Sequence, residues 1–379
     1  MSGHKGYKSE QVIGLDCLRF FAAMLVLMFH MSFWGWYAPD STTAIAMAGA
    51  GYFPKLGSWF NCGWVGVQIF FVISGFVISY TANTKSPYEF LRSRTARLYP
   101  DAWICATITL CFAMLAGVFP DTGTALARYA RSMILFPSGR WIDDVYWSLR
   151  VEISFYALVC ALLLLNAFQR IELVISVIGC VSAVFCVAIT ITPGNDHLIG
   201  SWIGELLLLS YGCCFALGAT FWLSMRTGIN IRRAALCCIY VIGTITPTWL
   251  RFGGHAAAFL FLGSLGWIGL SVRYNDAAIR AIGNKGVRYV RMIGLATYPI
   301  YLLHDVVGAV LVRWLVALGL PNETALGITI AVIVAAGIVV ALAAKPLRYI
   351  IGRAMDTVLR WLAPGMRARL QQPTFSAVP

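Results

Sequence analysis

The sequence predicts an all-α polytopic membrane protein with about ten transmembrane helices and both termini in the cytosol. Of its 379 residues, 59% are hydrophobic and only 12% are charged, and the mean hydropathy of +0.76 lies outside the range of soluble globular domains. Apolar runs long enough to cross a hydrocarbon core of about 30 Å, which takes ~20 helical residues, recur along the chain. Lysine and arginine concentrate in alternate connections between these runs, and this bias places both termini on the cytosolic side.

The expected spans follow one another without an internal repeat or a second soluble domain. They cover residues 15–36, 63–82, 101–119, 146–167, 172–192, 203–223, 234–250, 255–272, 292–316 and 324–344. Residues 1–345 are therefore expected to form one transmembrane domain, followed by a basic amphipathic cytosolic tail over 346–379. Arg348, Arg353 and Arg360 in this tail suit the anionic cytosolic leaflet.

The formal net charge of +13 would suggest a nucleic-acid partner for a soluble protein, but the positive-inside bias accounts for it here. No nucleic-acid partner is expected. The eleven cysteines fall mostly inside apolar runs with neither metal-type nor redox-type spacing, so they are interpreted as small buried hydrophobic residues. The sequence accordingly predicts no metal site and no bound cofactor.

Two ionisable side chains, Arg19 and His30, lie inside the first expected span. They are eleven residues apart, and at ~100° per residue eleven steps return a helix to within roughly 20° of its starting face, about 16 Å further along its axis. A charge inside a membrane costs from ~2.5 kcal/mol upwards and normally faces a protein interior or a wet cavity. The pair therefore predicts a polar track inside a helix bundle. Two other interpretations stay open: Arg19 snorkelling to the headgroups and His30 acting only in packing.

An arginine, ten residues and then a histidine in the first helix resemble the acyltransferase-3 family of integral membrane acyltransferases. Arg94 and Arg97, after the second span, are similar to an arginine pair that this family carries there. The segment WSLRVE, from Trp147 to Glu152, resembles the family's tryptophan, serine, leucine, x, x, glutamate signature. The resemblance implies that residues 1–345 form an acyltransferase domain.

The ninth span is similar to the family's tyrosine-rich penultimate helix, which ends in a histidine. It contains Tyr301, His304 and Asp305. The chain departs from the family at Ala344, where a glutamate commonly stands two residues before a proline. Any role of that glutamate is therefore in doubt for this protein.

The resemblance and the residue chemistry make His30 the candidate catalytic base, because histidine is the side chain best poised to take a hydroxyl proton near neutral pH. Glu152, or else Asp305, is expected to hold the imidazole tautomer and to stabilise its charged form. From the helix rise, His30 and Glu152 both lie ~7 Å inside the outer boundary, a depth compatible with contact. His304, Asp305 and Tyr301 are expected to support the site.

Structural alternatives stay open for several of these residues. Arg150 and Glu152 are compatible with a purely structural ion pair, and His304 and Asp305 are compatible with a pair that satisfies itself. Glu205, near the start of the sixth span, is an intramembrane acid to which the sequence assigns no role.

Acyl-CoA is the expected donor. Arg94 and Arg97, with Arg19 part way into the membrane, are expected to bind its phosphates, because the guanidinium fork binds phosphate bidentately; the alternative for this basic cytosolic loop is a topology signal. The external segment 120–146 is too long for a plain connection, and its aromatic residues suit either a sugar-binding groove or an interfacial belt. The residues expected to bind the acceptor are Trp141, Tyr146 and Trp147.

The sequence thus predicts a multi-pass O-acyltransferase of the bacterial cytoplasmic (inner) membrane, which moves an acetyl or other acyl group from cytosolic acyl-CoA to a hydroxyl of an extracytoplasmic glycan. Exopolysaccharide, lipopolysaccharide O-antigen, lipo-oligosaccharide and peptidoglycan remain open as acceptors. Direct transfer is expected, because no serine or cysteine has a recognisable nucleophile setting, with Ser32 and Ser148 left open.

The alternative function is a transporter of a lipid-linked sugar or small anion that uses an intramembrane His/Glu proton relay. The sequence shows no paired halves, which argues against it. The expected partners are acyl-CoA, a glycan or glycolipid acceptor and the lipid bilayer. The oligomeric state cannot be predicted from the sequence.

Overall fold

The computed structural model describes residues 12–192, 194, 198, 200–362 and 364–371. Within this part of the chain the secondary structure is helical throughout, and no β-strand occurs. The predicted all-α class is therefore confirmed.

The helices fall into two length classes. The long helices are α1 (Ile13–Phe29), α5 (Val65–Ala82), α6 (Pro87–Ala116), α8 (Trp147–Leu164), α9 (Ile171–Ile191), α11 (Gly212–Thr227), α12 (Ile231–Trp249), α13 (Gly254–Arg273), α14 (Asn275–Leu303) and α16 (Asn322–Trp361). The short helices are α2 (Gly35–Tyr37), α3 (Thr42–Met47), α4 (Pro54–Phe60), α7 (Thr122–Met133), α10 (Trp202–Leu206), α15 (Val306–Ala317) and α17 (Pro364–Gln371). A π-helical turn, η1 (His30–Trp34), continues α1, and two 3-10 turns, η2 (Asp144–Tyr146) and η3 (Phe168–Arg170), precede α8 and α9.

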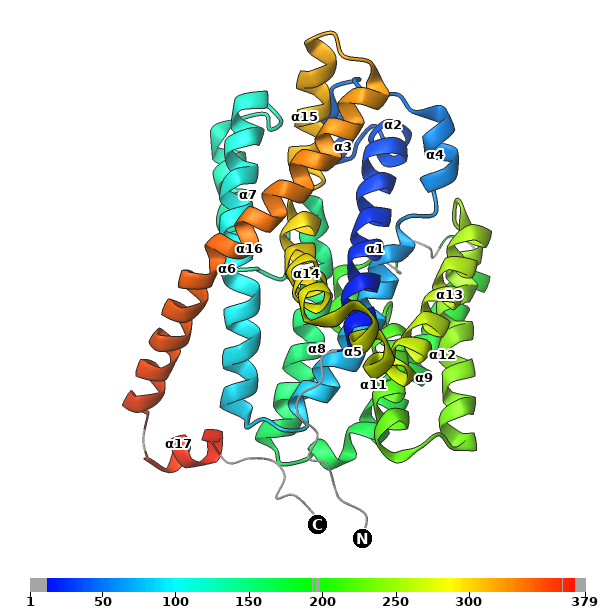
Figure 1. Ribbon diagram of the computed structural model, residues 1–379, viewed down its shortest axis with the longest axis vertical. Coiled ribbons are helices and arrows are strands. Elements are labelled where there is room, and N and C mark those ends of the chain that lie inside the picture. The colour runs from blue at the N-terminus through cyan, green and yellow to red at the C-terminus, as the bar shows by residue number, and fades with distance from the viewer. Residues whose placement is uncertain (1–11, 193, 195–197, 199, 363, 372–379) are drawn as a thin grey trace.

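The long helices form a bundle that is elongated in one direction. Figure 1 shows α2, α3, α4 and α15 gathered at one end of it and α17 at the opposite end. Within the described residues, seven helices, each counted with the short helices or turns next to it, are long and apolar enough to cross a membrane, or eight if the bent pair α14 and α15 is one span. The chain is therefore a multi-pass membrane protein.

The predicted number of ten spans, and the cytosolic placement of both termini, stay predictions. Seven expected spans coincide with the seven apolar helices, and 292–316 coincides with the bent pair, whose axes differ by 72°. The remaining two, 203–223 and 234–250, correspond to α11 and α12. α11 has only 16 residues, fewer than the ~20 that a hydrocarbon core requires, and α12 carries two arginines in its first turn.

α1 packs against α5, α13 and α14. Small residues allow the backbones to approach closely, as the sequence predicts for the second span. An added Cβ at Gly66 of α5 would lie 2.4 Å from the carbonyl oxygen of Ala22 in α1. The same holds between α5 and α11, where a Cβ at Gly218 would lie 1.9 Å from the carbonyl oxygen of Val72.

α6 begins earlier than the sequence analysis places it. Ser86 caps it in a capping box, a proline follows at the first helical position, and Gly117 ends it with a φ of 64°, all of which are standard helix boundaries. The 30 residues between them form one helix that contains Pro100. The expectation that Arg94 and Arg97 lie in a loop before a span at 101–119 is therefore wrong. Both arginines lie on α6, which fixes their positions more firmly than a loop would.

Two interruptions of helical geometry lie at His30 and His304. α1 is regular up to Phe29, and His30 opens the π-helical turn η1. α14 ends at Leu303 and α15 begins at Val306, so His304 and the residue after it occupy the bend. π-helical turns occur frequently at functional sites.

α16 runs as one helix of 40 residues across the boundary expected between residues 345 and 346. Its second half is attached to α6, because Arg348 pairs with Asp101 at 2.7 Å and Arg92 pairs with Asp356 at 2.8 Å. Figure 1 shows α16 crossing the bundle diagonally. Ala344, where the family often has glutamate, is fully buried in this helix.

Candidate active site

Three cavities follow one another along the bundle and share lining residues. We name them the arginine cavity (about 540 Å³), the middle cavity (about 80 Å³) and the histidine cavity (about 540 Å³). Arg19, Arg94 and Arg97 line both the arginine cavity and the middle cavity. Tyr301 lines both the middle cavity and the histidine cavity, which contains His30. Arg19 and His30 thus face the same row of cavities, as their helical spacing predicts.

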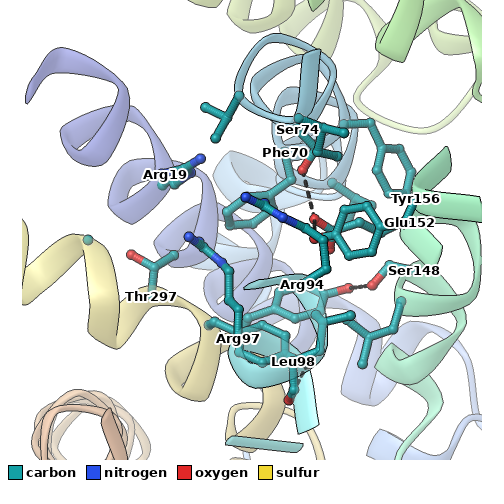
Figure 2. A pocket seen from close by; sticks show the side chains of 18 residues that line it. Arg19, Phe70, Ser74, Arg94, Arg97, Leu98, Ser148, Glu152, Tyr156 and Thr297 are labelled. Carbon is teal, nitrogen blue, oxygen red and sulfur yellow. Dashed lines mark hydrogen bonds between the residues drawn. The ribbon is translucent and has the colours of Figure 1, made fainter. Parts of the chain in front are cut away.

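The middle cavity brings together three guanidinium groups and one carboxylate. Figure 2 shows Arg19 from α1 and Arg94 and Arg97 from α6 around the same space, with Glu152 from α8 beside them. One of the three cations is compensated, because Arg19 pairs with Asp16 at 3.0 Å. The cavity therefore carries more positive than negative charge.

Arg94 is a buried cation without an anionic partner. It is 9% exposed, and within the described part of the chain it makes neither a hydrogen bond nor an ion pair; its Nε is buried and unbonded. Its guanidinium instead lies over the rings of Phe90 and Tyr156, at 5.6 and 5.7 Å from their centroids. Because an unpaired buried charge is costly, this site suits an anionic ligand.

Glu152 faces α5 and not α1. Its Oε1 accepts hydrogen bonds from the hydroxyls of Ser74 (3.0 Å) and Tyr156 (2.6 Å), and the first of these is dashed in Figure 2. No hydrogen bond joins it to His30 among the described residues, so the expectation that Glu152 holds the His30 imidazole is wrong. Depth along two helices can be estimated from the sequence, but the direction in which each side chain points around its helix also decides contact.

The partner of His30 is another histidine. Nε2 of His304 lies 3.0 Å from Nδ1 of His30, and the ring centroids are 4.9 Å apart. Nδ1 of His304 lies 2.6 Å from the carbonyl oxygen of Tyr301, and Nδ1 of His30 lies 3.0 Å from that of Val26. His304 is fully buried, whereas His30 is partly exposed to the histidine cavity.

These contacts fix the tautomers of the neutral pair. A carbonyl oxygen only accepts hydrogen bonds, so the Tyr301 oxygen requires a proton on Nδ1 of His304. Nε2 of His304 is then an acceptor, and Nδ1 of His30 must be the donor to it and to the Val26 oxygen. The lone pair of His30 is consequently on Nε2, where it can take a proton.

Asp305 does not hold the His30 imidazole either. It is 1% exposed and accepts a hydrogen bond from the Thr43 hydroxyl at 2.5 Å, although it lines the histidine cavity with His30. The pairing of His304 with Asp305, which was the structural alternative, is likewise not formed, because each side chain has another partner. His304 therefore takes the positioning role that the sequence analysis gave to a carboxylate.

Tyr301 stands at the passage between two cavities. Its hydroxyl lies 2.8 Å from the Ser148 hydroxyl, and Ser148 also donates to the carbonyl oxygen of Val145 at 2.9 Å. Ser32, the other serine left open as a nucleophile, is fully buried and donates to the carbonyl oxygen of Met28 at 2.6 Å. Ser32 is thus engaged with its own helix.

The three aromatic residues expected to bind the acceptor separate in the structure. Trp147 lines the histidine cavity. Trp141 is 6% exposed and donates to a backbone carbonyl at 3.0 Å, while Tyr146 is 1% exposed and donates to the carbonyl oxygen of Ala102 at 3.1 Å. Trp141 and Tyr146 are therefore packing residues with satisfied polar tips, and their expected role at the acceptor is wrong.

Arg150 pairs with Glu205 and not with Glu152. The pair is almost fully buried, and Arg150 also donates to the carbonyl oxygen of Pro137 at 2.9 Å and lies 5.0 Å from the Trp141 ring centroid. This explains the intramembrane acid Glu205. Arg150 of α8 thus holds both α10, through Glu205, and the loop before α8, through Pro137.

Several residues that line the histidine cavity were not predicted as site residues from the sequence. These are Trp34, Asp40, Trp64, Gln68, Asp144, Arg251 and Phe252. They come from loops and helix ends in separate parts of the chain, and none stands in a motif, so only the folded chain brings them together. Within the described residues, no group of three His, Cys, Asp or Glu side chains is arranged to hold a metal ion.

Comparison with known proteins identifies the family of this chain. The acyltransferase domain of the acyltransferase-3 family matches residues 12–344. The exopolysaccharide production protein ExoZ of Rhizobium meliloti is 28% identical over 281 residues, which are 70% of this chain and 83% of ExoZ.

Two further relatives have names that describe acyl transfer. The putative peptidoglycan O-acetyltransferase YrhL of Bacillus subtilis is 24% identical over 342 residues, 79% of this chain and 49% of YrhL, so the chain spans about half of that relative's length. The putative membrane-bound transacylase BcsY of Komagataeibacter xylinus is 25% identical over 268 residues, 65% of this chain and 66% of BcsY. No solved structure matches the chain. The match over residues 12–344 means that this chain belongs to the acyltransferase-3 family and is a membrane-embedded acyltransferase.

Proposed function

We propose that this enzyme transfers an acyl group, most simply acetyl, from cytosolic acyl-CoA to a hydroxyl of a glycan on the outer side of the bacterial cytoplasmic membrane. The observation that carries the proposal is the row of three cavities, with uncompensated arginines towards one end and the histidine pair at the other. The groups of an acyl-CoA molecule follow the same order, because its phosphates lie at one end of a thin chain and its thioester lies at the other.

The arginine end suits the phosphates. Arg94 makes no ion pair or hydrogen bond, and Arg97 makes none either within the described chain, so a phosphate would satisfy groups that are otherwise left without partners. Arg273 also lines the arginine cavity. The middle cavity, at about 80 Å³, is much smaller than the cavities on either side of it, and it suits the slender pantetheine chain.

The histidine end supplies the proton transfers. The acceptor hydroxyl gives its proton to Nε2 of His30 while its oxygen attacks the thioester carbonyl carbon. The new C–O bond forms, the C–S bond breaks, and the departing CoA thiolate takes the proton back from His30, so no net proton is released. His304 accepts from Nδ1 of His30 at 3.0 Å, which holds the ring and stabilises its charged form.

Two hydroxyls lie near the expected position of the reacting carbonyl. Tyr301 and Ser148 contact each other at the passage between the middle and histidine cavities, where the thioester would meet the acceptor. A hydroxyl donating to the carbonyl oxygen would stabilise the negative charge that develops there. Direct transfer needs no covalent enzyme intermediate, in keeping with the engagement of Ser32 in its own helix.

The names of two relatives support a glycan as the acceptor. One is named an exopolysaccharide production protein and another a putative peptidoglycan O-acetyltransferase. The lipid bilayer surrounds the enzyme, and neither nucleic acid nor a bound cofactor takes part in the proposed reaction.

The test is transfer of radiolabelled acetyl from acetyl-CoA to a glycan by the purified protein in lipid vesicles. We expect labelled glycan with the wild-type protein and none above background with His30→Ala. Movement of a sugar or anion across the vesicle membrane with no label in the glycan would contradict the proposal and favour the transporter alternative.

A further inference from the structure

The histidine cavity has an aromatic wall that the proton transfers do not use. Phe29, Trp34, Trp64 and Phe252 all line the cavity. The ring centroid of Phe252 lies 6.0 Å from that of Phe29, 5.9 Å from that of Trp34 and 6.5 Å from that of Trp64. Aromatic faces are electron-rich, so they suit the weakly positive C–H bonds on the flat face of a pyranose ring.

Carboxylates with free acceptor capacity stand in the same cavity. Asp144 accepts one hydrogen bond, from Thr42 at 2.6 Å through Oδ2, and its Oδ1 has no partner among the described residues. Asp40 also lines the cavity and accepts no hydrogen bond within the described chain. Ionised carboxylates are acceptors only, so both suit sugar hydroxyls, which donate.

The charge of this cavity is opposite to that of the middle cavity and to that of the arginine cavity, where four arginines outnumber Asp16 and Asp276. Asp40, Asp144 and Asp305 line it together with one arginine, Arg251, whose guanidinium lies 5.3 Å from the Trp64 ring centroid. Like charges placed next to a ligand disfavour it strongly. An acidic sugar would therefore meet an excess of carboxylates, whereas a neutral sugar would find acceptors for its hydroxyls.

The base and the aromatic wall are fixed relative to each other by one short element. His30 is the first residue of η1 and Trp34 is the last, and both side chains line the histidine cavity. A ring stacked on Trp34 is thereby held at a set distance from Nε2 of His30. This fixed arrangement would select which hydroxyl gives up its proton.

We propose that the histidine cavity binds a neutral pyranose, stacked on Trp34 and Phe252 and hydrogen-bonded by Asp40 and Asp144, with one hydroxyl directed to His30. This inference rests on the proposed glycan acyltransfer. It assigns the acceptor to these residues in place of Trp141 and Tyr146, which are buried in packing, and it excludes acidic sugars as preferred acceptors.

The experiment measures acetylation of two sugars that differ in one group. Methyl β-D-glucopyranoside and methyl β-D-glucopyranosiduronic acid are offered to the full chain in vesicles with radiolabelled acetyl-CoA, and kcat/KM is measured for each sugar. We expect the neutral glucoside to be preferred at least tenfold. Asp144→Asn together with Asp40→Asn should bring this ratio towards one.

Trp34→Ala should raise KM for the glucoside about tenfold, which corresponds to about 1.4 kcal/mol, and leave KM for acetyl-CoA unchanged; Trp34→Phe should recover part of the loss. The matched controls are Trp59→Ala, a tryptophan 79% exposed on α4, and Asp121→Asn, an exposed cap of α7, and neither should change the ratio. Unchanged KM for acetyl-CoA also shows that the variants are folded.

The outcomes separate this inference from the function on which it rests. Equal use of the two sugars, preference for the acid, or a ratio that the aspartate variants leave unmoved would overturn the neutral-acceptor site while the acyltransfer function stands. No label in either sugar, with acetyl-CoA bound normally, would overturn the proposed transfer to pyranose hydroxyls and the acceptor site together.

Discussion

At the scale of single residues, His30 depends on a neighbour 274 positions further along the chain. His304 and a backbone carbonyl both hold Nδ1 of His30, which leaves Nε2 as the basic nitrogen. In the more familiar arrangement a carboxylate plays this part. A neutral imidazole gives less stabilisation to the charged form of His30, but it also leaves the resting base free of a competing ion pair.

Substitutions in the histidine pair should lower the rate to different extents. His30→Ala removes the base and should lower kcat by about 10²–10⁴-fold, with KM for acetyl-CoA unchanged. His304→Ala should cost less, because the Val26 carbonyl still holds Nδ1 of His30. Steady-state kinetics in vesicles measures both, and an equal loss in the two variants would show that His304 takes part in proton transfer itself.

Glu152 should matter through its position beside the arginines. Glu152→Gln removes the carboxylate of the middle cavity, but the amide oxygen can still accept from Ser74 and Tyr156. We expect kcat to fall less than in His30→Ala. Rates equal to wild type would remove Glu152 from the site, and a full loss would restore it as a group essential for the chemistry.

Arg94 should determine donor affinity. Losing a charge-assisted hydrogen bond of ~1.5–3 kcal/mol should raise KM for acetyl-CoA by roughly 10- to 100-fold in Arg94→Ala, with kcat retained at saturating donor. Arg353→Ala, which removes an exposed arginine of α16, is the matched control and should leave KM unchanged. A parallel change in both variants would indicate a general effect of charge.

At the scale of helices, the close packing of α5 against its neighbours fixes the distances between the helices that line the cavities. α5 touches α1 on one side and α11 on the other, and its side chains, Ser74 among them, line the middle cavity. The glycines at these contacts set the distance between helices. They therefore control the width of the middle cavity although they do not line it.

Gly218→Ala should destabilise the bundle. The new Cβ would lie 1.9 Å from the carbonyl oxygen of Val72, so α5 and α11 must separate, at a cost of about 1–3 kcal/mol. Gly263→Ala, on an exposed position of α13 with no atom within 4 Å of the new Cβ, should be neutral or slightly stabilising. Thermal unfolding in detergent compares the two, and equal midpoints would refute the packing argument.

The buried pair of Arg150 and Glu205 should behave as a coupled unit. Arg150→Met alone leaves a buried carboxylate without its partner, a loss of about 3–5 kcal/mol. Combining it with Glu205→Leu should recover part of the stability, because the uncompensated charge is then removed as well. A double-mutant cycle on the unfolding midpoint measures the coupling, and strictly additive losses would contradict it.

At the scale of the whole molecule, composition and apolar runs were sufficient to predict an all-α membrane protein, because burial in lipid leaves a strong signal in every span. The row of cavities beside Arg19 and His30 was also predictable, since helical periodicity alone places two residues on one face. The helix start at Ser86 was missed, although a serine followed three residues later by Glu89 is the capping-box pattern that opens the helix.

The contacts within the site were less predictable. His30 meets His304 and not Glu152, and Arg150 meets Glu205, because rotation about each helix axis and the bend of 72° between α14 and α15 decide which side chains meet. The prediction of the aromatic residues that bind the acceptor was wrong for a similar reason. Trp141 and Tyr146 lie close in sequence to Trp147, yet they are buried, while Trp34 and Phe252 come from distant segments to line the histidine cavity.

The charges of the three cavities are arranged along the molecule with opposite signs at the two ends. This arrangement leads to the central claim that the donor enters at the arginine cavity and the acceptor at the histidine cavity. Under the proposed function, the two substrates would approach from opposite faces of the membrane, along a row of cavities that Arg19 and His30, about 16 Å apart on one membrane helix, both line.

The measurement that tests this claim most directly titrates acetyl-CoA separately on each face of oriented vesicles, with the glycan acceptor on the other face. The account predicts transfer only when acetyl-CoA is on the cytosolic face, with a KM that rises in the combined Arg94→Ala and Arg97→Ala variant while transfer at saturating donor survives. Acetyl-CoA consumed from the external face alone, or a double variant with unchanged donor dependence, would contradict it.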